Sequence, residues 1–557
     1  MNKRTRWAAL ALTAAMALTA LTGCSKDEEA FSLSVSVGGA PATLDPIYAV
    51  AEADQTVLSH LYEGLMRTTV SVSGESAVVN GMAKSVSPED SHDGTVTYTF
   101  KLRNAKWSDG EAVTAGDFVY AWQRLANPAN HAPNAALLSM VVGFQEARRS
   151  GDMSLLQVTA KNDSTLVVVL NGPCSWFLSE VCTAPATAPL REDVVLARTE
   201  AAKTANAAAE ASGGTGNSAW WSDALALVTN GPYRVTESTD TLLDLTVNPR
   251  YTGLRPGPTE LTLHYADTPE AAAALYADKT VDFVWALPEE QLAALDPALL
   301  ARELSTYTVL FNVRAELFTD PLVRQALFLA IDRNAVAALA GVTAKPAGGL
   351  VPECVPQGGE GFRSLGGDLL DNKPEKYAEL CGQARDCLQE AGYDSGLNIA
   401  PLEYLYVDQG TNAAVAQALA GMWRDVLRVR VQPVAVTEQE LQTALQTGNY
   451  TMAAADVTAV GNDAECFLMQ WDSASVQNVS GYANSAYDTL MSIIASASDD
   501  TARMGCLHDA ENLLLADHVL SPLYTTGTDW TLRERYTGLS RDARGWFNFS
   551  SVTQRTA

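Results

Sequence analysis

Hydrophobic and polar residues alternate along the chain with two different periods. Apolar side chains stand at every second position of the segment 96–102, which predicts a strand with one buried face. Thr114, with Asp117 three residues later, predicts the capped start of a helix that ends at Asn127-Pro128. Two apolar runs that meet at Asn162-Asp163 predict a hairpin.

The second half of the chain shows longer helical patterns. Asp320 followed by Pro321 predicts an N-cap and the first residue of a helix, and another helix is expected from Pro374 to Gly392. Ala197–Ser218, rich in Ala, Gly, Asn and Thr, predicts a helical insertion at a surface edge that ends in a Gly213-Gly214 turn. Apolar stripes at helical spacing are expected to be core: Leu322, Val323, Ala326, Leu327, Ala330 and Ile331, then Val415, Leu419, Met422, Trp423 and Val426.

Strands and helices alternate throughout, so we expect mixed α/β lobes rather than a helical bundle or a β-sandwich. With 557 residues, the chain is long enough for two to four such lobes at about 100 to 200 residues per domain.

The first 24 residues form a separate segment. Lys3, Arg4 and Arg6 precede an uncharged apolar run of 15 residues, Trp7 to Leu21. A membrane-spanning helix needs about 20 apolar residues, whereas the core of a signal peptide needs about 7 to 15. We therefore expect residues 1–23 to be an export signal that is removed.

Leu21-Thr22-Gly23-Cys24 resembles the lipobox of bacterial lipoproteins. The resemblance implies that Cys24 is lipidated and that residues 24–30 are a polar tether. The alternative is an ordinary cleaved signal in which Cys24 has no such role.

Charge and cysteine content exclude several classes of protein. With 65 acidic and 38 basic residues, a formal charge of −27, the chain offers no basic face to neutralise phosphates, so we expect no nucleic acid partner. Seven cysteines follow Cys24 with no CxxC spacing, which argues against zinc and thioredoxin-like sites. A Cys174–Cys182 disulfide and buried free thiols both remain open.

Signatures of catalysis are missing. The sequence has no GxSxG, SxxK, HExxH, GxGxxG or Walker A motif. Its six histidines show no spacing typical of metal ligands. We expect a binding protein, not an enzyme, with no metal site and no cofactor.

Several motifs, in order and spacing, resemble the family 5 extracellular solute-binding proteins, the oligopeptide receptors of ABC importers. The resemblance covers essentially the whole mature chain. It rests on Pro41–Pro46, Leu61–Leu65, Tyr98–Pro128, Asn230–Tyr233, Asn248–Tyr251, Phe311-Asn312, Asp320–Ala326 and Ile331–Arg333, with weaker matches at Gly481-Tyr482, Tyr487-Asp488 and Ser521–Tyr524.

The resemblance implies an α/β fold: a two-lobed periplasmic-binding-protein-like clamshell, type II and cluster C, with an additional inserted domain. Such a receptor is expected to be a monomer. The expected limits are 31–67, 220–304 and 520–557 for lobe I, 68–219 for the extra domain, and 305–519 for lobe II.

The resemblance also implies how the ligand is held. An extended peptide pairs its backbone with a short segment of each lobe, and the lobes close over it. Carried over by motif, Asn412 is placed near the ligand's carboxylate, Trp285 on the hinge side, and Asn134 on the extra domain. The ligand-pairing segments are Val50, Ala51 and Glu52 in lobe I and Asp456, Val457 and Thr458 in lobe II.

This sequence departs from the family at two places. Members that hold a peptide's α-ammonium use an aspartate where Val460 stands here. Because a buried ammonium without a counter-charge is costly, either a nearby carboxylate replaces it or the ligand is not a free-amino peptide; the candidates are Asp456, Asp463 and Glu465. Ser305 and Thr458 occupy the places of a lobe-crossing cysteine pair found in some members.

The predicted function is an exported lipoprotein on the outer face of the bacterial cytoplasmic membrane, at the cell surface or in the periplasm. It captures oligopeptides and delivers them to the permease subunits of an ABC importer. Two alternatives stay open: a receptor of the same fold for a nickel complex, a sugar or a modified peptide, and a peptide-sensing lipoprotein not coupled to transport.

Overall fold

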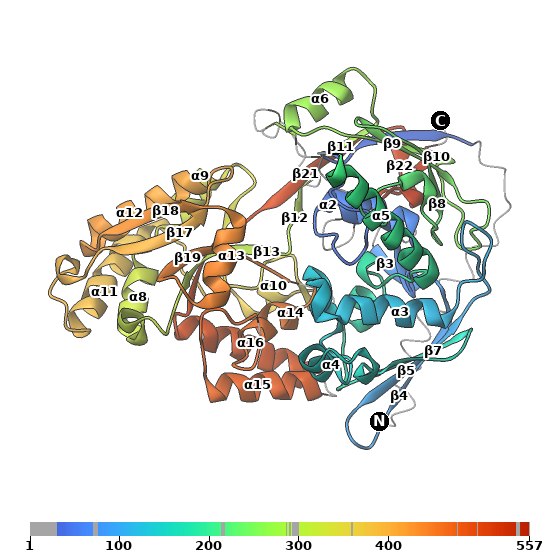
Figure 1. The fold of residues 1–557 in the computed structure, drawn as a ribbon. Helices are drawn as coiled ribbons and strands as arrows, with labels where there is room; N and C mark the ends of the chain where they lie inside the picture. Colours follow the sequence, from blue (N-terminus) through green and yellow to red (C-terminus); the bar gives the residue numbers. More distant parts are fainter. Residues whose placement is uncertain are drawn as a thin grey trace.

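The computed structural model describes two bodies joined by two short connections (Figure 1). One body contains the N-terminal half and the C-terminus, and the other contains most of residues 305–525. The described residues are 30–70, 76–212, 218–285, 287–288, 291, 300–357, 360–459, 461–475, 477–497, 500–541 and 546–555.

A seven-stranded sheet forms the centre of the first body, in the order β12-β21-β11-β1-β10-β9-β8. β1 runs parallel to β10 and β11, whereas the other pairs are antiparallel. The strands are β1 (Ser32–Ser36), β8 (Tyr233–Ser238), β9 (Leu242–Val247), β10 (Glu260–His264), β11 (Phe283–Trp285), β12 (Leu300–Arg302) and β21 (Gly527–Leu532). Helices α2 (Glu52–Leu61) and α6 (Pro269–Ala277) and the short strands β22 (Tyr536–Thr537), β23 (Ser540–Arg541), β24 (Phe547–Asn548) and β25 (Thr553–Gln554) complete it.

The extra domain is built on a four-stranded antiparallel sheet in the order β4-β5-β7-β6. Its strands are β4 (Ala83–Asp90), β5 (Val96–Leu102), β6 (Val158–Asn162) and β7 (Thr165–Leu170), preceded by the hairpin of β2 (Met66–Val70) and β3 (Ser76–Asn80). Its helices are α3 (Ala115–Ala126), α4 (Phe144–Ser150) and α5 (Glu192–Ala211).

A mixed six-stranded sheet forms the centre of the second body, in the order β14-β20-β13-β19-β17-β18. The strands are β13 (Ser305–Phe311), β14 (Lys345–Pro346), β17 (Leu402–Val407), β18 (Val431–Val436), β19 (Met452–Thr458) and β20 (Leu520–Thr525). The small hairpin of β15 (Pro356–Gln357) and β16 (Glu360–Gly361) lies outside it. The helices are α8 (Pro321–Leu329), α9 (Arg333–Ala340), α10 (Phe362–Gly366), α11 (Tyr377–Glu390), α12 (Asn412–Leu427), α13 (Glu438–Thr447), α14 (Ala464–Leu468), α15 (Ser485–Ser496) and α16 (Asp500–Ala516).

The return crossing between the bodies lies later than the sequence predicted. The predicted limit after residue 519 assigns β20 to lobe I, but β20 pairs with β13 in the second sheet. The chain crosses only after this strand is complete, between Thr525 and Gly527.

Local predictions agree well with the elements. β5 has the predicted alternating burial, and α3 has the capping box of Thr114 and Asp117. β6 and β7 form the predicted hairpin, and the Asp320 carboxylate caps α8. Pro374 lies in a 3₁₀ turn, so the helix α11 begins three residues later, at Tyr377.

The long helix α5 corresponds to the predicted insertion, and its single fully buried side chain is Val195. The predicted turn at Gly213-Gly214 lies outside the described residues. Cys174 and Cys182 are both buried and unpaired, so the alternative of a disulfide between them is not realised.

Candidate ligand-binding site

Two short connections join the bodies, and one carboxylate ties them together. Glu303 follows β12, and Thr526 lies between β20 and β21. The Glu303 carboxylate accepts hydrogen bonds from the hydroxyls of Thr526 at 2.8 Å and Thr528 at 2.6 Å, and its backbone N–H donates to the Thr526 carbonyl at 3.2 Å. The crossings are thereby held side by side, as expected of a hinge.

Next to the hinge, the second sheet leaves part of one strand edge unpaired. β13 covers one edge of β19 along its whole length. On the other edge, among the described residues, β17 pairs with β19 only at Met452 and Ala453. The segment 454–458 therefore has one edge without a strand partner.

The antiparallel ladder shows which backbone groups face this free edge. Ala459 N–H donates to Leu304 O at 3.3 Å, and Asn312 N–H donates to Thr451 O at 3.1 Å. Because ladder bonds alternate along a strand, the odd-numbered residues of β19 bond to β13. The backbone groups of Asp456 and Thr458 consequently point to the free edge, where the Gln470 side chain already reaches Thr458 O at 2.9 Å.

The predicted pairing segment of lobe I is an extended stretch before α2. Val50 is 63% exposed, and Ala51 is the N-cap residue, with φ −66° and ψ 146°. The Asn134 side chain of the extra domain donates to the Ala49 carbonyl at 2.7 Å, and the Gln55 amide reaches the same oxygen. Asn134 therefore ties the extra domain to the residue that precedes this segment.

The carboxyls of Glu52, Glu303 and Asp456 form an acidic group in which Glu303 acts on the other two. Burial raises the pKa of Glu52 to about 8, Arg541 opposes the rise, and Glu303 adds to it. Burial also raises the pKa of Asp456 to about 6, Glu303 adds to the rise, and a hydrogen bond from Ser305 opposes it. Glu303 therefore links Glu52 of lobe I with Asp456 of lobe II.

Asp456 combines exposure with a raised pKa. Its side chain is exposed to solvent. Its pKa is raised because protein packed around the carboxylate limits its hydration and because Glu303 lies near.

The other two candidate carboxylates are occupied. Arg503 donates to Asp463 at 2.8 Å and to Glu465 at 2.6 Å. Asp463 also caps α14 through the Glu465 N–H at 2.8 Å. Asp456 is left as the candidate without a cationic partner among the described residues. Val460 lies outside those residues.

Two further predicted site residues, Trp285 and Asn412, lie at the ends of regular elements. Trp285 ends β11, pairs with Trp530 and packs against the ring of Phe547 at 5.4 Å. The Asn412 side chain begins α12 and donates to Val407 O at 3.1 Å. The Phe547 ring that contacts Trp285 also lies 5.5 Å from the Arg541 guanidinium, which is 3.4 Å from Glu52. Ser305 and Thr458 face each other in the β13–β19 ladder, where the cysteine pair would stand.

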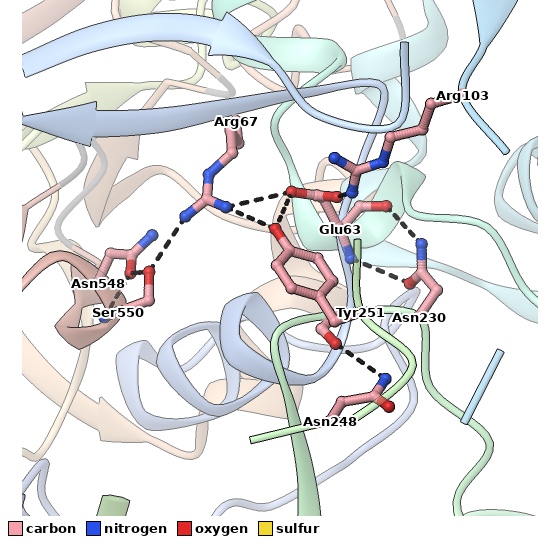
Figure 2. A network of polar contacts seen from close by, with 9 residues as sticks. Glu63, Arg67, Arg103, Asn230, Asn248, Tyr251, Asn548 and Ser550 are labelled. Atoms are coloured by element: carbon pink, nitrogen blue, oxygen red, sulfur yellow. Dashed lines mark hydrogen bonds and ion pairs between the residues drawn. The ribbon is translucent and has the colours of Figure 1, made fainter. Parts of the chain in front are cut away.

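Several of the motifs that carry the family resemblance hold domains together. Figure 2 shows Glu63 at the centre of a buried network: its carboxylate accepts from Arg67 at 3.2 Å, from Arg103, and from the Tyr251 hydroxyl at 2.6 Å. The Asn230 amide pairs with the Glu63 backbone N–H at 3.0 Å and C=O at 2.9 Å. Arg103 belongs to the extra domain, so the network joins that domain to lobe I.

A second buried group, around Asp45 of the Pro41–Pro46 motif, also joins the extra domain to lobe I. Asp45 accepts two hydrogen bonds from Arg124 of α3, at 2.7 and 2.6 Å, and one from the Trp220 indole at 2.7 Å. These motif residues stabilise an interface between domains.

The sequence patterns did not mark Glu303 of the acidic group or Arg541, the cation that pairs with Glu52. Glu303 lies just before β13, and Arg541 lies in β23, where its guanidinium is 3.4 Å from Glu52. Neither lies in a quoted motif, so no local signal marked them.

Among the described residues, no cluster of three or more His, Cys, Asp or Glu side chains is arranged to hold a metal ion. No helix in the described part of the chain is long and apolar enough to span a membrane.

Comparison with known proteins identifies the family to which this fold belongs. The model of the bacterial extracellular solute-binding proteins, family 5 middle, matches residues 77–478, well over half of the chain. The chain belongs to this family. Its members are binding proteins rather than enzymes, and this receptor is one of them.

Curated relatives span nearly the full length of the receptor. It is 26% identical to the dipeptide-binding protein DppE of Bacillus subtilis, over 95% of each chain. It is 27% identical to the probable deoxycholate-binding periplasmic protein YgiS of Escherichia coli, over 87% of this chain and 86% of the other.

A solved structure confirms the predicted fold class. Haemophilus influenzae OppA, in complex with the peptide RPPGFSPFR, is similar with a TM-score of 0.74 and 26% identity. The match covers 95% of this chain and 99% of that one. The receptor is therefore a two-lobed α/β clamshell of the periplasmic-binding-protein type.

Proposed function

We propose that this receptor captures oligopeptides in the gap between its lobes and delivers them to the permease subunits of an ABC importer. The observation that carries the proposal is the free edge of β19 beside the hinge. There, backbone groups of Asp456 and Thr458 are positioned for an extended peptide to add as a strand. Oligopeptide- and dipeptide-binding proteins among its relatives support the same ligand class.

Strand addition would explain why the receptor accepts many peptide sequences and why its lobes close over a bound peptide. Each backbone hydrogen bond contributes roughly 0.5 to 1.5 kcal/mol and does not read the ligand's side chains, so sequence preference is broad. A peptide that contacts Asp456–Thr458 and Val50–Glu52 together favours the state in which both lobes touch it. Asn134, Trp285 and Asn412 are proposed to complete the lining of the gap.

We assign the anchor for the peptide's α-ammonium to Asp456. The Glu303 carboxylate adds negative charge at Asp456. Glu52, whose pKa is raised to about 8, is largely protonated at neutral pH and lies 3.4 Å from the Arg541 guanidinium. A cationic group entering this gap therefore meets an unpaired carboxylate, and the resulting ion pair relieves the cost of keeping the Asp456 carboxylate ionised.

The proposal predicts a bell-shaped pH dependence of binding. A bound ammonium favours the ionised carboxylate, so affinity is expected to rise as pH passes upward through about 6, the pKa of Asp456. Affinity falls again above about pH 8, because a free α-amino group loses its proton with a pKa of about 7.7 to 8.0. Calorimetry with a pool of free-amino tripeptides to pentapeptides, repeated from acid to alkaline pH, measures this.

The same pool with acetylated amino termini is the control. It lacks the cation, so its weaker affinity is expected to stay level over this pH range. Absence of binding by either pool would refute the peptide ligand. Equal, pH-independent affinity for both pools would refute the Asp456 anchor.

The receptor is proposed to be an exported monomer anchored to the outer face of the membrane by lipid on Cys24, with residues 24–30 as a tether. This part of the proposal rests on the lipobox resemblance, and it agrees with the periplasmic naming of several relatives. The lobe limits are proposed as predicted, with the return crossing moved to 525–527.

A further inference from the structure

A loop of the extra domain contacts the second lobe directly. This loop follows β7, runs from Gly172 to Val181, and ends in a single helical turn at Phe177–Val181. Ser175 Oγ donates to Asp463 Oδ2 at 2.9 Å, joining residues 288 positions apart in the sequence. Asp463 stands at the start of α14. In Figure 1, α14, α15 and α16 lie below the crossings, beside the extra domain.

The lobe II side of this contact is fixed by its own hydrogen bonds. Asp463 Oδ1 accepts from Arg503 at 2.8 Å and from the Glu465 N–H at 2.8 Å. Arg503 also donates to Glu465 at 2.6 Å. Because these bonds occupy Oδ1, the other oxygen is already oriented when Ser175 approaches.

Two glycines, one from each side, allow the surfaces to meet closely. A Cβ on Gly172 would lie 2.6 Å from the carbonyl oxygen of Ala495 in α15. A Cβ on Gly461 would lie 2.7 Å from Glu180 Cγ in the loop. Both glycines are buried, so a methyl group at either position would wedge the domains apart.

The contact also buries two thiols. Cys174 of the loop is 6% exposed and Cys466 of α14 is fully buried. Although Cys466 belongs to the chain of lobe II, it joins the hydrophobic core shared by lobe I and the extra domain. Burial raises the pKa of both thiols, so in this state both are shielded from alkylation.

We propose that the Gly172–Val181 loop and the start of α14 form a latch that favours the closed state through contacts separate from the ligand. The extra domain then takes part in closing, and its surface influences how much of the free receptor is closed. The inference rests on the proposed closing motion, and the test below separates the two.

The test measures alkylation of each cysteine by N-ethylmaleimide, resolved by peptide mass spectrometry, on the full ligand-free chain. Gly172→Ala is expected to speed alkylation of Cys174 and Cys466 about tenfold or more by wedging the latch open. Cys182, buried inside the extra domain, is the internal control and stays slow. Gly382→Ala, a helix position with open space around it, is the matched variant and leaves all rates unchanged.

Ser175→Ala removes only the hydrogen bond to Asp463. If Gly172→Ala does not fold, the alkylation rates of Cys174 and Cys466 are measured in Ser175→Ala instead. Its expected acceleration is about 2- to 10-fold. Unchanged rates in the folded variants would overturn the latch, even if the free-amino peptide pool still protects Cys174. Accelerated rates with no protection by any peptide would leave the latch standing and refute the peptide-driven closing.

Discussion

Glu63→Gln is expected to lower the free energy of unfolding by about 3 to 5 kcal/mol, the cost of leaving a buried charge without its partner. Glu63 is 4% exposed and neutralises both Arg67 and Arg103. Glutamine keeps the shape but removes the charge, and its NH₂ group would face guanidinium donors. Denaturant unfolding followed by tryptophan fluorescence measures the loss.

Glu200→Gln is the matched control. Glu200 forms an ion pair with Lys203 on the surface of α5, where both side chains are more than half exposed. Such a pair contributes about 0 to 1 kcal/mol, so the control is expected to match the wild type closely. If Glu63→Gln unfolds like this control, the network does not hold the extra domain to lobe I.

Asp456→Asn is expected to weaken binding of the free-amino peptide pool about 10- to 100-fold. A hydrogen bond to a charged group contributes roughly 1.5 to 3 kcal/mol, and about 1.4 kcal/mol corresponds to a tenfold change in affinity. The rise of affinity through pH 6 should disappear with it, because the group whose pKa is about 6 has been removed. Calorimetry at two pH values measures both effects.

Glu403→Gln tests whether any loss of charge on this sheet has the same effect. Glu403 lies on β17 with an exposed side chain, so its replacement should leave affinity unchanged. The acetylated pool should bind Asp456→Asn and wild type alike. A similar loss with the acetylated pool would show that Asp456 supports the cleft without contacting the ammonium.

Elements governed by local pattern were predicted well from the sequence. The alternation in β5 and the Thr114–Asp117 capping box of α3 depend on residues within one turn or one strand. Such signals do not need the rest of the fold. A limit set by packing shifted where β20 completes the second sheet before the chain crosses back.

The site depends on contacts that no local pattern contains. The free edge of β19 exists because β17 diverges after Ala453, and Glu303 meets both Glu52 and Asp456 only in the folded chain. Arg503, which lies on a different helix, forms ion pairs with both Asp463 and Glu465. The sequence left three carboxylates as equal candidates, and tertiary contacts reduce them to one.

The residues that carry the family resemblance need not be the residues that bind the ligand. Glu63, Asn230 and Tyr251 lie in well-matched segments, yet they join domains rather than line the gap (Figure 2). Backbone pairing places little demand on side chains, so the proposed ligand-pairing segments are expected to have no strong sequence signature.

Amide hydrogen exchange, resolved to single residues along β19, tests the central claim most directly. Val457 already bonds within the ladder to β13, so its amide should exchange slowly with or without ligand. Adding the free-amino peptide pool is predicted to slow exchange at Asp456 and Thr458, whose N–H groups face the free edge. Unchanged exchange at both residues while peptide is bound would contradict capture by strand addition.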